Sequence, residues 1–363
     1  MIYLDQAATS FPKIQPVKDA VNRAMDIAGN ANRSMDVSSS RLIFETRQKV
    51  AEYFHVPDFR YVIFNSGNTE SLNTCIYGVL KKGDHVITTY AEHNSVLRPL
   101  YDLEKKGLIQ LSICAPYLDS ISQNIRENTV IVILSHSSNV TGEIYDVDAI
   151  GRYVRSKNIL MMVDAAQSAG HVPMSMENID IVCFSGHKGL LGVSGIGGIC
   201  LKNYIDVSCL KVGGTGFDSL NHEQPQAYPE HLEAGTMNLL GIASLNAGVQ
   251  YLMEHQESIE QKERQLMERL YQRVSSIHNL IVYSQQEHST PIFAFNVRGM
   301  DNTRVADLLM SKYDIVTRCK MHCAPEMHKH LKSNGLVRAS FSFLNTLEEV
   351  DVFVQALVEL CGE

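Results

Sequence analysis

Residues 179–188 read IDIVCFSGHK, an apolar run that passes directly into Ser-Gly-His-Lys. The run at 179–184 is rich in β-branched and aromatic residues and has the length of a buried strand. Similar runs lie upstream at 61–64, 84–89, 130–135 and 159–164. Patterns with helical spacing follow three of them, at 69–80, 94–105 and 146–155. Near-continuous apolar strands that alternate with helices predict an α/β fold, with a mostly parallel sheet between helices.

Polar side chains stand at the ends of these apolar runs. Asn65 and Asp164 lie at the ends of two runs, while Asn139 and Lys188 follow shortly after two others. In an open parallel sheet, ligands bind outside the carboxyl ends of the strands. These four positions are therefore candidates for a ligand site at that edge of the sheet.

The C-terminal third of the chain has a different organisation. Residues 242–276 predict one long helix that bridges two domains, with charge-rich text at 254–273. The elements predicted beyond it are a strand at 291–298, a helix at 303–312, a strand at 337–343 and a helix at 347–360. This mixture predicts a smaller α/β domain.

The composition is that of an ordinary globular protein. Apolar residues make up 45% and charged residues 20% of the 363-residue chain. The formal net charge of −8 argues against general nucleic-acid binding, which needs a basic excess. No apolar run has the roughly 18–20 residues of a membrane helix, and residues 1–5 do not resemble a secretory signal. The eight cysteines are scattered singly, so we expect reduced thiols in a cytoplasmic protein.

Lys188 stands between a predicted strand and the glycine-rich stretch 189–198. Taken alone, it reads equally well as an exposed lysine in a turn. Its neighbours Ser185, Gly186 and His187 add a hydroxyl, an unencumbered amide and an imidazole, which together suit a phosphate. A lysine that forms a Schiff base must lose its proton, and a partly desolvated, cation-rich site lowers its pKa.

Three other segments supply groups that suit a flat, phosphorylated ligand. Asn68 and Thr69 begin a predicted helix, whose amides bind phosphate readily, although they also suit a simple helix cap. Asp164 is placed to keep a pyridine nitrogen protonated, or to cap the next helix. His93 is an aromatic side chain able to stack on a ring, or a plain loop histidine.

The order and spacing of these segments resemble the class V aminotransferase family, within fold type I of the pyridoxal-phosphate enzymes. The resemblance is strongest to the cysteine desulfurase branch and its selenocysteine lyase relatives, and it covers nearly the whole chain. The segments that carry it are YLDQAAT (3–9), GDHVI (83–87), EHNS (92–95), SNVTG (138–142), DAAQ (164–167), SGHK (185–188), LEAGT (232–236) and HCAP (322–325).

The resemblance implies a fold and a set of residue roles. The large domain, residues 15–250, would hold a mostly parallel seven-stranded sheet, and residues 1–14 with 251–363 would form the small domain. Lys188 would carry pyridoxal phosphate as a Schiff base. The other implied cofactor ligands are Asp164 at the pyridine nitrogen, Gln167 and Asn139 at the ring substituents, His93 stacked on the ring, Asn68, Thr69, Ser185 and His187 at the phosphate, and Thr236 from the other subunit of a homodimer. Arg338, with Asn139, would hold the substrate carboxylate.

Cys323 determines which reaction the resemblance implies. L-Cysteine would be converted to L-alanine, with Lys188 as general base and His93 assisting proton transfer, and the sulfur would pass to Cys323 as a persulfide. Nearby cations favour the thiolate form of such a cysteine, whereas a buried cysteine is usually a small apolar residue. A metal site that joins Cys323 to His322, His328 and His330 matches no ordinary zinc spacing, so none is expected.

The loop before Cys323 departs from the family pattern. Relatives usually have Thr-Gly, or a similar small pair, after the preceding arginine, whereas this chain has Cys319-Lys320. Lys320 would alter the loop geometry or the choice of acceptor, and Cys319 is either a second thiol or a simple substitution. The short interval before Cys323 resembles desulfurases whose sheltered persulfide needs a partner protein, which would pass sulfur to iron–sulfur clusters, thiolated nucleotides or another acceptor. The alternatives are a selenocysteine lyase or other lyase or aminotransferase of this family, and a non-catalytic scaffold.

Overall fold

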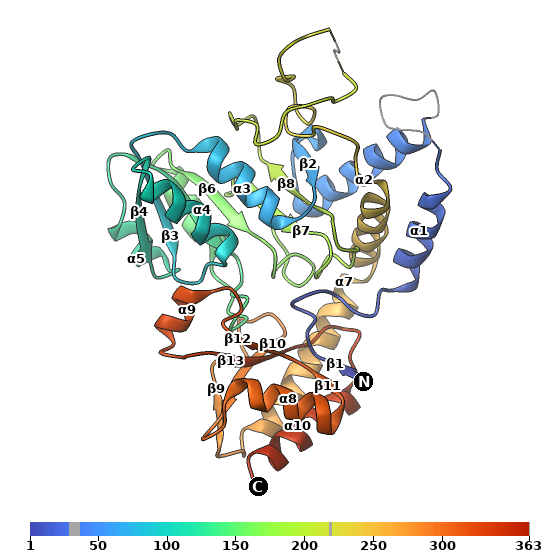
Figure 1. Ribbon diagram of the computed structural model, residues 1–363, viewed down its shortest axis with the longest axis vertical. Helices are drawn as coiled ribbons and strands as arrows, with labels where there is room; N and C mark the ends of the chain where they lie inside the picture. The colour runs from blue at the N-terminus through green and yellow to red at the C-terminus, as the bar shows by residue number, and fades with distance from the viewer. Residues whose placement is uncertain (29–36, 218–219, 363) are drawn as a thin grey trace.

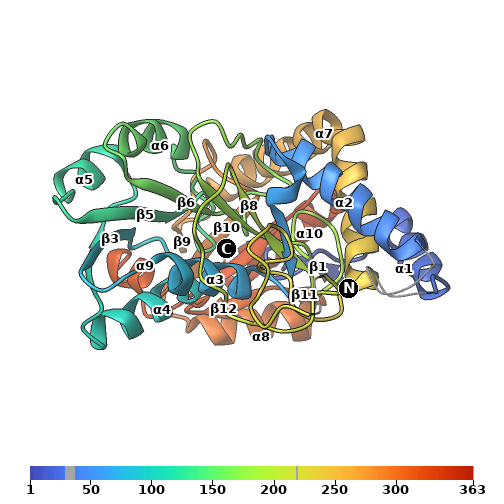
Figure 2. The same ribbon diagram turned by 90° about the horizontal axis from the view of Figure 1, so that it is seen from above.

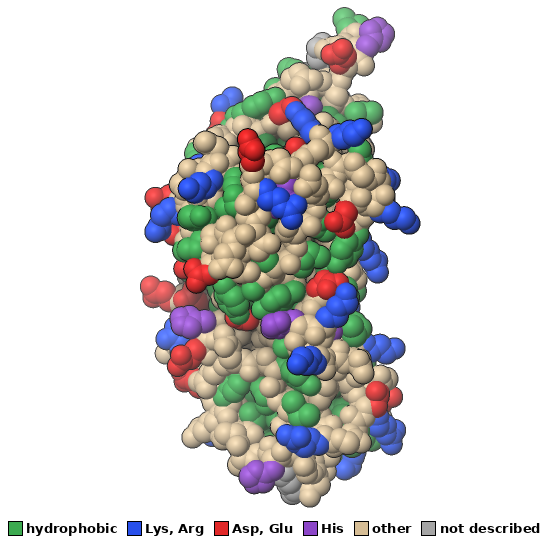
Figure 3. Space-filling view, turned by 90° about the vertical axis from the view of Figure 1, so that its left-hand side faces the viewer, with side chains coloured by type: hydrophobic (Ala, Val, Ile, Leu, Met, Phe, Trp, Pro, Cys, Tyr) green, Lys and Arg blue, Asp and Glu red, His purple; other side chains and the backbone are tan. Residues whose placement is uncertain are grey.

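The computed structural model describes residues 1–28, 37–217 and 220–362. It has an upper part built on a seven-stranded sheet and a lower part built on a four-stranded sheet (Figure 1). The long helix α7 (Leu239–Val274) runs from one part into the other. On the face in Figure 3, basic and acidic side chains are interspersed, and histidines lie where the two parts meet.

The central sheet is mixed but mostly parallel. Its order is β2 (Val62–Asn65), β8 (Gly197–Leu201), β7 (Ile181–Ser185), β6 (Leu160–Asp164), β5 (Thr129–Ser135), β3 (Asp84–Thr89) and β4 (Ile109–Cys114). β8 runs antiparallel to both of its neighbours, and the other pairs are parallel. The carboxyl ends of the parallel strands therefore meet at one edge.

Helices cover both faces of this sheet (Figure 2). The strands alternate their side chains between two apolar layers: in β5, Val132 and Leu134 enter one core cluster, and Ile131 and Ile133 enter another. One layer packs on α3 (Asn68–Val79) and α4 (Asn94–Lys105), and the other on α2 (Ser38–Phe54), α6 (Val147–Arg155) and the first half of α7. The remaining helices of the upper part are α1 (Gln15–Met25), which packs on α7, the short α5 (Leu118–Gln123) and the 3-10 turn η1 (Phe59–Tyr61).

The lower part is an antiparallel sheet backed by helices. Its strand order is β12 (Arg318–Lys320), β13 (Leu336–Ser340), β10 (Ile292–Val297) and β9 (Leu280–Val282). The helices that accompany it are α8 (Asn302–Tyr313), α9 (Pro325–His330) and α10 (Leu347–Leu360). The N-terminal strand β1 (Ile2–Tyr3) pairs in parallel with β11 (Ile315–Val316), and Leu4 enters the same apolar core.

The predicted fold class is confirmed: an α/β protein with a mostly parallel seven-stranded sheet and a smaller α/β part. The division at residue 250 stays a prediction. It falls inside α7, whose first half contributes Leu245 and Val249 to the upper core and whose second half contributes Leu266 and Leu270 to the lower one. In the described part of the chain, no helix is long and apolar enough to cross a bilayer.

Candidate active site

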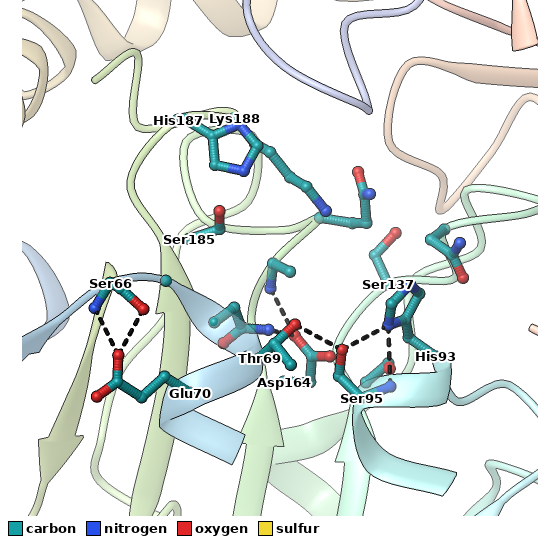
Figure 4. Close-up of a pocket in the computed structure, with 16 residues that line it drawn as sticks. Ser66, Thr69, Glu70, His93, Ser95, Ser137, Asp164, Ser185, His187 and Lys188 are labelled. Atoms are coloured by element: carbon teal, nitrogen blue, oxygen red, sulfur yellow. Dashed lines mark hydrogen bonds between the residues drawn. The ribbon is translucent and has the colours of Figure 1, made fainter. Parts of the chain in front are cut away.

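A cavity of about 280 Å³ opens at the carboxyl edge of the sheet. Nine of the residues predicted from the sequence line it: Asn68, Thr69, His93, Asn139, Asp164, Gln167, Ser185, His187 and Lys188. Lys188 extends toward the space bordered by Asp164 and His93 (Figure 4). Cys323, Arg338 and Thr236 are not among the lining residues. Four serines that were not predicted also line it, at 66, 95, 135 and 137, and their only signal in the sequence is their position beside strand ends or helix starts.

Lys188 follows β7 and reaches into the cavity from the glycine-rich turn. Burial lowers its pKa to about 8, and the charges of Arg338 and Arg318 act in the same direction, while Asp164 opposes them. A lysine with this pKa has a substantial neutral fraction near pH 8. The side chain is therefore suited to Schiff-base formation and to proton abstraction.

Asp164 closes β6 at the floor of the cavity. Its Oδ1 accepts hydrogen bonds from the Asn68 side-chain amide at 2.7 Å and from the Ala166 backbone amide at 2.8 Å. Burial raises the pKa of Asp164, and these two donors and the charge of Lys188 oppose that rise. The Asn68 amide thus serves Asp164, while its Oδ1 is buried without a partner among the described residues. The phosphate role of Asn68 stays a prediction.

The start of α3 forms the other wall. Gly67 precedes the helix with φ 151°, and its amide donates to Asn65 Oδ1 at 3.0 Å. A Cβ at Gly197 would lie 2.6 Å from the Gly67 Cα, so the close approach of β8 requires glycine there. Glu70 accepts from both the amide and the hydroxyl of Ser66, as Figure 4 shows. This geometry holds the first turn of α3 open toward the cavity.

His93 is the N-cap of α4, and its ring is fixed by Ser95. The Ser95 amide donates to Nδ1 at 3.1 Å, and the Ser95 hydroxyl lies 2.9 Å from the same atom. Burial lowers the pKa of His93 to about 4, helped by the charges of Lys188 and Arg318, so the ring is neutral at pH 7. Because Nδ1 accepts a hydrogen bond, we assign the proton to Nε2. Ser95 Oγ also lies 2.8 Å from Thr69 Oγ1, which links His93 to α3.

Cys323 lies on an exposed loop between β12 and α9, and this loop is fastened beside the cavity. The Cys323 carbonyl accepts from the Asn94 amide at 2.7 Å, at the start of α4. The His322 carbonyl accepts from the Asn139 side chain at 2.7 Å. Arg318 Nη2 donates a long hydrogen bond, of 4.0 Å, to Cys323 Sγ. The loop thus joins the thiol to two elements of the cavity wall.

Cys319 and Lys320, which replace the small pair usual in the family, occupy different environments in the structure. Cys319 packs against the core of the lower part, so strand alternation turns Arg318 and Lys320 to the other face of β12. Cys319 is therefore a packing residue in this fold. Lys320 has φ 79°, in the left-handed region that favours glycine, and His322 and Cys323 follow with φ 47° and 58°. The loop stores backbone strain directly before the thiol.

This strain predicts an inverted order of stability at position 320. Because an L-residue with left-handed φ is strained, Lys320→Gly should be more stable than Lys320→Ala by about 1 kcal/mol. The thermal midpoints of the two variants measure the difference. Lys312, which is exposed in α8, is the matched control, since alanine should exceed glycine there by about 1 kcal/mol. Alanine above glycine at both positions would contradict the strain.

Arg338 is buried, with 1% of its side chain exposed. Nη1 donates to the Asn139 carbonyl at 2.7 Å, and Nη2 pairs with Asp5 Oδ1 at 2.9 Å. Nε has no partner among the described residues. Burial lowers the pKa of Arg338, and the Asp5 charge opposes that shift. Its predicted role as the carboxylate ligand stays a prediction.

Thr236 lies on an exposed loop outside the cavity of its own chain. The loop is fixed by Glu233, which forms a bidentate ion pair with the buried Arg47 at 2.8 and 2.9 Å and accepts from the Phe64 amide. The predicted role of Thr236 in the other subunit stays a prediction.

His322 and His328 stack with ring centres 5.9 Å apart, but the described residues hold no group of three metal-ligating side chains there or elsewhere.

Comparisons with known proteins agree with this geometry. The family model for aminotransferase class-V matches residues 2–353. A Pyrococcus abyssi protein named "Probable cysteine desulfurase" is 33% identical, over 99% of this chain and 94% of its own. The Escherichia coli cysteine desulfurase CsdA is 31% identical, over 98% and 93%.

Two solved structures are similar to this chain over nearly its whole length. The apo cysteine desulfurase of Thermococcus onnurineus superposes with a TM-score of 0.93 at 30% identity, covering 99% of this chain and 94% of that one. The E. coli CsdA structure, an S-sulfonic acid form, has a TM-score of 0.87 at 29% identity, covering 98% and 94%. The resemblance drawn from the sequence is thereby confirmed: the chain belongs to the class-V aminotransferase family.

Proposed function

We propose that this protein is a cysteine desulfurase, which converts L-cysteine to L-alanine and takes the sulfur onto Cys323 as a persulfide. The observation that carries the proposal is the 2.7 Å bond from the Asn94 amide to the Cys323 carbonyl. This bond attaches an exposed thiol to the helix start next to His93, at the wall of a cavity that also holds Lys188 and Asp164. The relatives named above as cysteine desulfurases support the same reaction.

The cavity fits pyridoxal phosphate. Lys188, whose lowered pKa allows a neutral amine, and the buried Asp164 border the same space. The cofactor's aldehyde requires such an amine, and its pyridine nitrogen requires such an acid. His187 Nδ1 and Asn68 Oδ1 are buried without partners among the described residues, and both line the cavity. Ser185, His187, Thr69 and the α3 amides would hold the phosphate. When bound, the cofactor supplies an electron sink for the pair left by the Cα–H bond.

The protein's own groups perform the remaining chemistry. Lys188 would take the Cα proton of the bound substrate, and its lowered pKa suits that task. The Cys323 thiolate attacks the substrate sulfur, forming an S–S bond as the substrate C–S bond breaks. The electron pair of the C–S bond stays with the carbon fragment, which is protonated to give alanine. His93, with its proton on Nε2, is placed to move a proton at the substrate sulfur.

Other residues, a second copy of the chain and a protein acceptor would complete this reaction. Arg338 and Asn139 would bind the substrate carboxylate. Thr236 would complete the phosphate site of a second copy in a homodimer. A protein acceptor would then withdraw the sulfur from Cys323, which is exposed on its loop.

The test is anaerobic incubation of the pyridoxal-phosphate-loaded protein with L-cysteine. We expect alanine, and a Cys323 peptide that carries one added sulfur atom in its mass spectrum. A dithiol reductant should remove that sulfur and release sulfide. Alanine from selenocysteine but not from cysteine would contradict the proposal, as would added sulfur only on other cysteines.

A further inference from the structure

The N-terminal arm, residues 4–13, joins the two ends of the candidate site. Asp5 pairs with Arg338, and the Ala7 carbonyl accepts from Gln167 at 3.0 Å. Further along, the Ser10 amide and the Thr9 hydroxyl both donate to the His187 carbonyl at 3.0 Å. In Figure 1 this dark-blue segment rises from the lower part, beside β11, to the upper part. The arm therefore contacts Gln167 and His187, two residues that line the cavity, and its one acidic side chain pairs with Arg338.

The Asp5 carboxylate is held in place by the backbone on either side of it. Leu4 exchanges backbone hydrogen bonds with Val316 and Ser340, and the Ala7 amide donates to Ser340 Oγ at 2.9 Å. The Tyr3 hydroxyl donates to the Asp5 carbonyl at 3.1 Å. Because the backbone is already fixed, only the side-chain torsions of Asp5 lose freedom when its carboxylate pairs with Arg338.

Arg338 already uses two of its five N–H groups on internal acceptors. Nη1 is used by the Asn139 carbonyl and Nη2 by Asp5, whereas Nε is buried and has no partner among the described residues. A planar guanidinium binds a carboxylate best through two adjacent N–H groups. An incoming carboxylate can use Nε together with the second N–H of Nη2, beside Asp5, or displace Asp5 from Nη2. In either case it meets the like charge of Asp5 in a buried site, where charges are poorly screened.

We infer that Asp5 is a positioning residue that competes with the substrate carboxylate for Arg338 and thereby sets the affinity for the amino-acid substrate. The inference rests on the proposed function, in which Arg338 binds that carboxylate. Asp5 neutralises the buried guanidinium between turnovers, when an unpaired charge would be destabilising. The substrate carboxylate must share the guanidinium with this internal partner or displace it, so part of its binding energy is offset by repulsion from Asp5 or by the loss of the Asp5–Arg338 pair.

The test compares the loaded wild-type protein with Asp5→Asn. Removing the rival charge should lower the KM for L-cysteine roughly tenfold, the equivalent of one charge-assisted hydrogen bond, with little change in kcat. L-Alanine, which carries the same carboxylate, should raise the thermal midpoint more in Asp5→Asn than in the wild type. Asp5→Ser repeats the charge removal if Asp5→Asn fails to fold, and Asp5→Glu, which keeps the charge, should restore the higher KM.

Asp314→Asn is the matched control. Asp314 pairs with the Met1 ammonium at 2.6 Å, so this variant removes an acid that holds the chain just before the arm, without touching Arg338. Its KM should stay at the wild-type value. An unchanged or raised KM in both neutral Asp5 variants would overturn the inference, as would an equal fall in Asp314→Asn. A wild-type protein that makes no alanine would instead contradict the proposed function, and the L-alanine thermal shift would still measure the role of Asp5.

Discussion

Lys188→Ala is expected to lower alanine production from L-cysteine by at least roughly 1,000-fold, because one side chain serves both as the cofactor anchor and as the general base. Lys188 reaches the cavity between Asp164 and His93, and its lowered pKa, about 8, suits both tasks. The variant should also lose the visible absorbance band that borohydride bleaches in the wild type. Steady-state alanine release and the absorbance spectrum measure the two effects separately.

A second lysine provides the control. Lys13 also has a pKa lowered to about 8 by burial, and its Nζ lies 3.3 Å from the His187 carbonyl, outside the lining of the cavity. Lys13→Ala should keep the bleachable band, and borohydride reduction followed by peptide mapping should place the cofactor on Lys188. Cofactor attached to Lys13 would contradict the assignment. Because only a neutral amine attacks an aldehyde, the rate of cofactor uptake by the apoprotein should rise with pH through the Lys188 pKa of about 8 and level off above it.

The cofactor side of the site could be predicted from the sequence because buried strands appear there as continuous apolar runs. An apolar run ends where the chain leaves the sheet, so Asp164 and the stretch before Lys188 mark the edge at which parallel strands end. β8 has no such run, since it begins with Gly197-Gly198 and glycine has a low strand propensity. A Cβ at Gly197 would lie too close to the turn at Gly67, and a Cβ at Gly198 would lie 2.4 Å from the Ile63 carbonyl oxygen.

The substrate side of the site could not be derived in the same way. Its geometry depends on contacts between residues far apart in the chain: Asp5 with Arg338, Asn139 with His322, and Asn94 with Cys323. No local pattern encodes these pairs, and the left-handed conformation of Lys320 is opposite to what its side chain favours. The resemblance to the family identified Arg338 and Cys323, but only the fold shows that Arg338 is already paired with an acid, Asp5.

Cys323→Ala is expected to lower alanine production from L-cysteine at least roughly 100-fold while leaving cofactor attachment intact. The reason is geometric. Cys323 is the exposed cysteine of the described chain, and the bond from the Asn94 amide to its carbonyl holds it beside the cavity. Without that nucleophile the substrate C–S bond has no sulfur acceptor. The bleachable band should persist, so the loss can be assigned to sulfur transfer rather than to cofactor binding.

Cys319→Ala is the control that makes this prediction specific. Cys319 lies four residues earlier on the same segment, but it packs against the lower core rather than beside the cavity. Its removal should leave the added sulfur on Cys323 and cost about 1 kcal/mol of stability from lost packing. If Cys323→Ala retained full alanine and sulfide production, sulfur transfer through Cys323 would be wrong. If Cys319→Ala alone abolished the added sulfur, Cys319 would be the acceptor thiol. The packing role assigned to Cys319, on the face of β12 opposite Arg318, would then be wrong.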